Sequence, residues 1–161
     1  MGGGEPVQLG KAELKLANYL PFRLSVASNA VAGLIARAYE DRFGITIPQW
    51  RLICVLASEP RLTQAQLVAR TVMDKVTVSR AAQGLVARSL VDRADNLADG
   101  RSHMLTLSEE GWRLYSEVAP VALGYEAQLT AGLAPDEVRL LHRLLDRLQS
   151  AATALAAEGE T

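Results

Sequence analysis

The stretch of residues 63–107 constrains the fold more than any other part of this 161-residue chain. Thr63 and Gln66 match the T-x-x-Q capping box, so a short helix is expected to begin there. A break follows and ends at Asp74, a favoured N-cap residue, after which a longer helix is expected. Two helices separated by a short break predict a helix-turn-helix over residues 63–89.

Helical periodicity then disappears over residues 90–107. Two short apolar segments, 90–93 and 103–107, are predicted to be strands, and the loop between them contains an Asp-Gly-Arg sequence that ends at Arg101. A helix-turn-helix followed by such a hairpin is the element order of a winged helix. We therefore expect a winged helix domain over residues 45–108, with the wing at 90–107.

Helical segments flank this domain on both sides. Residues 16–44 carry apolar side chains at three- and four-residue intervals, and Gly44 suits the left-handed position that ends a helix. The last helix opens at Pro135 and carries a heptad stripe that is too wide for one neighbour. The stripe consists of Val138, Leu141, Leu145, Leu148, Ala152 and Leu155, with Leu140 and Leu144 beside it.

The predicted fold is therefore mainly α with a small β-hairpin (α+β), in which a winged helix-turn-helix domain is joined to a helical dimerisation region. Residues 16–44 and 109–157 are expected to form that region in a homodimer, while residues 1–15 are expected to be a flexible tail. The alternative for the leucine stripe is packing onto its own domain.

Several classes of protein are not supported by the sequence. No apolar run reaches the roughly 18 residues of a membrane span, and no secretory signal is apparent, so no membrane partner and a cytoplasmic location are expected. No glycine-rich phosphate loop, G-x-S-x-G motif or nucleophile–His–carboxylate set is present, so neither an enzyme nor a cofactor is predicted. The two histidines have no grouping with Cys, Asp or Glu that would indicate a metal site.

The lone cysteine, Cys54, rules out an intramolecular disulfide and fits a reducing cytoplasm. It lies in the apolar run LICVL without a basic neighbour, which favours a buried structural cysteine over a redox sensor.

The side chains of the second helix of the helix-turn-helix suit DNA. An α-helix fits the major groove, where polar side chains such as Arg80 and Gln83 can read base edges. Lys75, near the helix start, suits a phosphate, and an arginine at a hairpin tip, such as Arg101, suits the narrow minor groove. The core-facing positions of this helix are predicted to be Val76, Ala82, Leu85 and Val86.

The segment "MDKVTVSRAAQGLVARSLVDRADNLADGRSHMLTLSEEGWRLY" resembles the MarR family of bacterial transcription regulators. The shared pattern is a D-K-x-T-V-S-R helix, an R-x-L-V-x-R strand, a D-x-R wing and an L-[TS]-x-x-G helix start, and the likeness extends over residues 20–156. It implies a homodimer that places one recognition helix and one wing per protomer on a pseudo-palindromic operator in double-stranded DNA. It also implies that Asp99 holds the wing tip in shape around Arg101, although Ser102 and His103 stand where the family usually has a second basic residue.

From the residue types and the resemblance together, nine residues are predicted to form the DNA site. They are Lys75, Thr77, Val78, Ser79, Arg80, Gln83, Arg88, Asp99 and Arg101.

The resemblance further implies a small effector, often aromatic and anionic, bound between the helical region and the winged domain. Candidate lining residues are Tyr19, Phe22, Arg23, Arg37, Tyr39 and Trp50, for which core packing is the alternative. The expected function is thus a repressor that is released from its operator by a small ligand. A winged-helix dimer that binds protein instead of DNA is the second hypothesis, and the acidic Asp92, Asp95 and Asp99 around the wing favour it.

Overall fold

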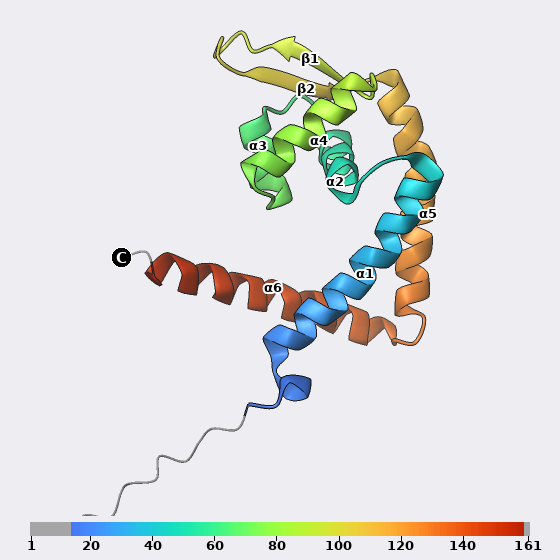
Figure 1. Ribbon diagram of the computed structural model, residues 1–161, viewed down its shortest axis with the longest axis vertical. Coiled ribbons are helices and arrows are strands. Elements are labelled where there is room, and N and C mark those ends of the chain that lie inside the picture. Colours follow the sequence, from blue (N-terminus) through green and yellow to red (C-terminus); the bar gives the residue numbers. More distant parts are fainter. Residues whose placement is uncertain (1–13, 160–161) are drawn as a thin grey trace, which may run out of the picture.

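The structure, a computed structural model, describes residues 14–159, so most of the predicted tail lies outside the described residues. A winged helix domain forms one end of the molecule, and three long helices extend from it (Figure 1). In chain order the elements are η1 (Leu16–Asn18), α1 (Leu20–Phe43), α2 (Ile47–Ser58), α3 (Gln64–Thr71), α4 (Lys75–Ala87), β1 (Val91–Asp95), β2 (His103–Leu107), α5 (Glu109–Thr130) and α6 (Pro135–Gly159).

The predicted fold class is confirmed. Helices α2, α3 and α4 pack together against an antiparallel two-stranded sheet, which is the winged helix arrangement. The middle of this domain is a cluster of fully buried side chains from all of these elements, among them Leu52, Ile53, Leu67, Leu85 and Leu105. One face of α4 packs into this cluster, and the opposite face is exposed to solvent.

Local side-chain hydrogen bonds set the helix starts. Thr63 forms the predicted capping box with Gln66, and the Asp74 carboxylate accepts a hydrogen bond from the backbone N–H of Thr77 at 2.8 Å. Helix α2 has a second capping box, Thr46 with Gln49, and it begins at Ile47, one residue before Pro48.

The wing strands pair from Val91 with Leu107 to Asp95 with His103. Strand β2 has its predicted bounds, whereas β1 begins one residue later and ends two residues later than expected. An isolated bridge between Leu62 and Leu105 ties the base of the wing to the segment before α3.

A tight joint connects the winged domain to α5. The hydroxyl of Ser108 donates to the backbone carbonyl of Ser89 at 2.7 Å and accepts from the N–H of Gly111 at 3.0 Å. A Cβ atom on Gly111 would lie only 2.1 Å from the carbonyl oxygen of Leu90. Only glycine lets the start of α5 approach the domain this closely.

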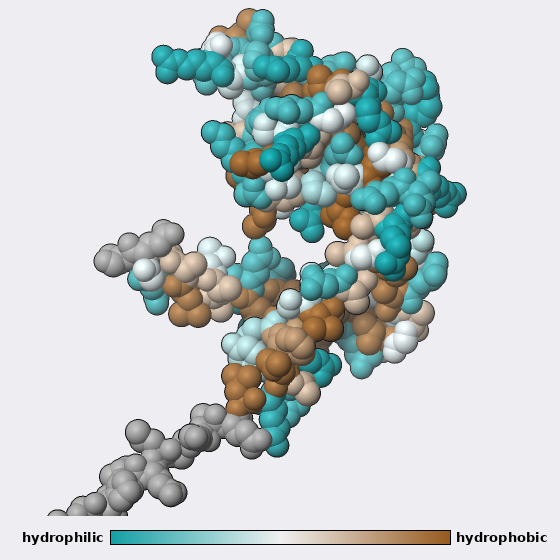
Figure 2. All heavy atoms as spheres, viewed as in Figure 1, coloured by the Kyte–Doolittle hydropathy of each residue, from teal (hydrophilic) through white to brown (hydrophobic). Residues whose placement is uncertain are grey.

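The long helices keep much of their apolar surface exposed. Helix α6 has no buried residue among those described, and its six leucines are between 39 and 69% exposed. Figure 2 shows apolar side chains on the surfaces of α1 and α6. No helix in the described part of the chain is both long and apolar enough to cross a membrane.

Candidate nucleic-acid interface

Helix α4 turns one face to the core and the opposite face to solvent. Its buried side chains are Val78, Ala81, Ala82 and Leu85, which lie on one side of the helix. On the other side, Arg80 and Gln83 are exposed, while Thr77 and Ser79 are half-buried at the edges. Lys75 is exposed at the first residue of the helix.

Two expectations for this helix are wrong, and both concern valines. Val78 was expected to contact DNA, yet its side chain is 0% exposed and packs in the core. Val76 was expected to face the core, yet it is 58% exposed. Two residues apart on a helix point about 160° apart, so the two side chains lie on nearly opposite sides of α4.

Arg88 also has a different role from the one expected. Its guanidinium donates hydrogen bonds to the backbone carbonyls of Gly44 at 2.6 Å and Phe43 at 3.3 Å, at the C-terminal end of α1. A cation at this end of a helix stabilises it by satisfying free carbonyls and the negative end of the dipole. We therefore assign Arg88 to the joint between α4 and α1 instead of to the DNA site.

Hydrogen bonds made by side chains close the tip of the wing. The Asp99 carboxylate accepts from the backbone N–H of Arg101 at 3.1 Å, and the Asn96 amide donates to the Ser102 hydroxyl at 2.8 Å. Asp99 thus supports the tip through the backbone of Arg101, which leaves the guanidinium of Arg101 exposed. Where the strands meet the loop, His103 Nδ1 lies 3.4 Å from a carboxylate oxygen of Asp95.

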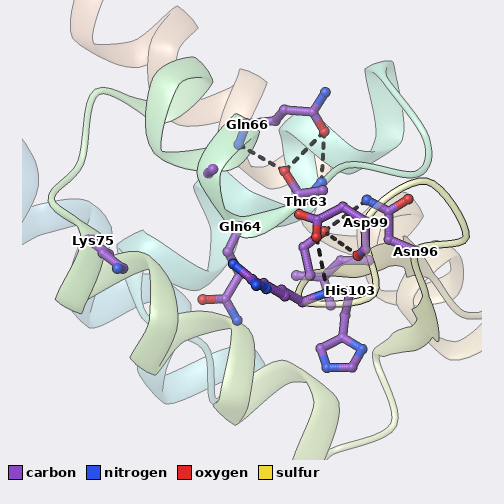
Figure 3. A pocket seen from close by; sticks show the side chains of 11 residues that line it. Thr63, Gln64, Gln66, Lys75, Asn96, Asp99 and His103 are labelled. Carbon is purple, nitrogen blue, oxygen red and sulfur yellow. Dashed lines mark hydrogen bonds between the residues drawn. The ribbon is translucent and has the colours of Figure 1, made fainter.

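A cleft of about 590 Å³ separates the wing from the helix-turn-helix. Figure 3 shows Lys75, Gln64 and His103 around this cleft, with Asp99 and Asn96 from the wing loop. Arg101 also lines it. Sequence reasoning did not include Gln64, Asn96 or His103, because nothing local brings the start of α3 and the wing together.

The basic side chains on this side of the domain are not neutralised. Within residues 14–159, Lys75, Arg80 and Arg101 form no ion pair. Beside them, the Thr77 hydroxyl and backbone N–H donate to Asp74 and hold the pKa of its carboxyl below the usual value. That carboxylate is therefore occupied in capping α4, and the three cations remain available to an anionic partner.

A second cleft, of about 330 Å³, lies between α1 and α2. Tyr39 and Trp50, two of the predicted ligand-site residues, line it together with Arg51 and Ser28. Their rings meet edge to face, with centroids 5.9 Å apart. Tyr39 is also buried in the hydrophobic core, so this residue packs in the core as well as lining the cleft.

The other four ligand-site candidates do not line this cleft. Tyr19, Phe22 and Arg23 lie at the opposite end of α1, since the 17 residues from Phe22 to Tyr39 span about 25 Å. Arg37 is exposed on α1 outside the cleft. The single chain therefore brings together only two of the six.

Burial raises the pKa of the Cys54 thiol to about 11. With this raised pKa, the thiolate, which is the reactive form, is scarce at neutral pH. The environment of Cys54 accordingly favours the structural interpretation over a redox sensor.

Comparisons with known proteins agree on one class. A model of the MarR family matches residues 43–102. The chain is 30% identical to a probable transcriptional regulator of Pseudomonas aeruginosa of known structure, with a TM-score of 0.74 over 83% of this chain and 99% of that one.

Two further proteins are similar over most of their length. The regulator PcaV of Streptomyces coelicolor, solved with its natural ligand, is 27% identical, with a TM-score of 0.74 over 88% of this chain and 99% of that one. An HTH-type transcriptional repressor of Mycobacterium bovis is 25% identical over 142 residues, which are 88% of this chain and 99% of the repressor.

Proposed function

Since the chain belongs to the MarR family of transcription regulators, we propose that it is a homodimeric repressor that binds a specific operator through α4 and the wing. Helix α4 would lie in the major groove and the wing in the adjacent minor groove.

The observation that carries this proposal is the cleft between the helix-turn-helix and the wing, which is lined by the start of α3, by Lys75 at the first residue of α4 and by the wing loop. A sugar-phosphate strand separates the major from the minor groove, so a protein that enters both must accommodate that strand between its two reading elements. The cleft has this position, and the unpaired cations Lys75 and Arg101 line it. Of the three acidic residues that favour the protein-binding alternative, Asp99 is occupied within the wing, where its carboxylate accepts from the backbone N–H of Arg101.

The exposed leucine stripe of α6 supports the dimer. An amphipathic helix that finds no partner in its own chain is expected to find one in a second copy, and most such assemblies are two-fold symmetric. A symmetric dimer would place two α4 helices on two half-sites, so the operator should be a pseudo-palindrome.

We further propose that the α1–α2 cleft holds the effector. The lining of this cleft is mostly aliphatic and aromatic, which suits a flat ring, and the guanidinium of Arg51 suits a carboxylate or phenolate. PcaV was solved with its natural ligand, which supports a ligand site in this fold but does not give its chemistry here. The ligand would release DNA by binding better to a dimer whose α4 helices no longer match the half-sites.

The direct test is selection of binding sites from random DNA by the full-length protein. Enrichment of an inverted repeat is the expected result. Failure to enrich any sequence would favour the protein-binding alternative. Repeating the selection with phenolic and aromatic carboxylic acids would then identify an effector by loss of the enriched DNA.

Arg101→Ala should weaken operator binding by about 1–3 kcal/mol, because a guanidinium in the minor groove is lost. The slope of log affinity against log salt should also become less steep by about two, because each dimer loses two guanidinium groups and each contributes about 0.9. Titration by fluorescence anisotropy at several salt concentrations measures both quantities. Wild-type affinity in this variant would contradict the assignment of the wing.

Arg80→Ala should weaken binding to the selected operator more than binding to random DNA, because a base contact contributes only on the correct sequence. Lys75→Ala is the matched comparison, since loss of a phosphate contact should weaken both by the same factor. Competition titrations with operator and random duplexes distinguish the two. If Arg80→Ala weakened binding to operator and to random DNA by the same factor, Arg80 would contact the DNA backbone and not a base.

A further inference from the structure

An exposed valine lies at the centre of the outer face of α4. Val76 is two residues beyond the N-cap Asp74, and its side chain is 58% exposed. Counting 100° per residue, Arg80 and Gln83 lie on the same side as Val76, and the buried Val78 and Leu85 lie on the opposite side. Val76 therefore belongs to the stripe of α4 that is farthest from the domain core.

Neither folding nor solubility explains a valine at this position. An exposed β-branched side chain is a weaker helix former than Ala, Lys, Glu or Gln, and here it gains no burial in return. The long exposed side chains beside it on this stripe, Arg80 and Gln83, are polar, and only the small Ala87 follows them at the end of the helix. An apolar side chain among them suits a partner that presents an apolar group.

The major groove of DNA offers one such group. Among the base edges, only thymine carries a methyl group there, and the other groups are hydrogen-bond donors or acceptors. Residues near the N-terminus of a recognition helix are the ones that reach base edges, and Val76 lies in the first turn of α4. We propose that Val76 reads the 5-methyl group of a thymine in each half-site.

The geometry of α4 places this thymine relative to a second base. Side chains four residues apart on a helix are about 5–6 Å apart at Cβ, and successive base pairs are about 3.4 Å apart. If Arg80 takes a guanine, which is the commonest partner of arginine in the major groove, that guanine lies within about two base pairs of the thymine. This inference rests on the proposed function, because it assumes that α4 enters the major groove.

The test removes the methyl group and nothing else. Each thymine of the selected operator is replaced in turn by uracil, and the affinities of wild-type protein and Val76→Ala are measured on every duplex. For wild type, one substitution per half-site should reduce affinity by about fourfold, as expected for the loss of one buried methyl contact. Val76→Ala should bind the thymine and uracil duplexes equally at that position, and Val76→Ile should retain the preference.

Val72→Ala is the matched control. Val72 is a second exposed valine, in the turn before α4, where it is 75% exposed with φ at 54°. Val72→Ala should keep the wild-type preference for thymine over uracil. A loss of that preference in Val72→Ala but not in Val76→Ala would overturn the proposal. Insensitivity of wild-type protein to every uracil would also overturn it. Failure to select any operator would instead contradict the proposed function, so the two failures are distinguishable.

Discussion

A chain carrying Leu141→Glu and Leu145→Glu should sediment as a monomer and bind operator DNA at least about a hundredfold more weakly than wild type. Both leucines lie on the exposed stripe of α6. A carboxylate placed in an apolar interface is desolvated without a partner, and the interface cannot form around two of them in each protomer. The loss of DNA affinity follows because a dimer binds its second half-site at a high effective concentration, which contributes about 10²–10⁴ in affinity.

Analytical ultracentrifugation measures the first effect and anisotropy titration the second. The control variant, Arg143→Glu with Ser150→Glu, adds the same two carboxylates to the opposite side of α6. It should remain a dimer, and its operator affinity should fall much less than that of the double-leucine variant. A dimeric double-leucine variant would show that α6 covers its stripe within its own chain, and the proposed interface would then be wrong.

Gly111→Ala should lower the free energy of unfolding by about 3 kcal/mol, because the joint between the winged domain and α5 has no room for a methyl group. The new Cβ would lie 2.1 Å from the carbonyl oxygen of Leu90 and 3.2 Å from a methyl carbon of Leu107. Since the first of these atoms is backbone, no rotamer change relieves the overlap, and α5 must move away from the domain. The hydrogen bonds of Ser108 across the same joint would be strained as α5 moves.

Gly124→Ala provides a control within the same helix. Its Cβ would meet no atom within 4 Å, so the exchange should stabilise α5 by roughly 0.5–1 kcal/mol through the better helix propensity of alanine. Urea denaturation at equal protein concentration compares the two variants with wild type, because unfolding of a dimer depends on concentration. Equal stability of the two variants would contradict the close approach at Gly111.

The parts of the fold that were predictable depend on residues close in sequence. Thr63, Asp74 and Ser108 each cap a helix through a hydrogen bond to a residue three positions later, and each start was expected. The same signal is present at Thr46 and Gln49, where α2 begins.

The parts that were missed depend on tertiary packing. The apolar character of Val76 suggested burial, whereas the core is reached by the side chains at 78, 81, 82 and 85. Arg88 reaches a carbonyl 44 residues away, and Gly111 meets the carbonyl of Leu90, and no local pattern indicates either contact. The DNA-site hypothesis survived these corrections because Lys75, Arg80, Gln83 and Arg101 are all exposed.

The hydrogen bonds of Arg88 have a mechanical consequence. They fasten the C-terminal end of α4 to the end of α1, so the recognition helix cannot swing independently of that helix. Helix α1 has 24 residues and acts as a lever arm about 36 Å long. A tilt of about 5° at its far end would displace α4 by about 3 Å, close to one base-pair step of about 3.4 Å. The angle of α1 at the dimer axis would thus set the half-site spacing that the protein accepts.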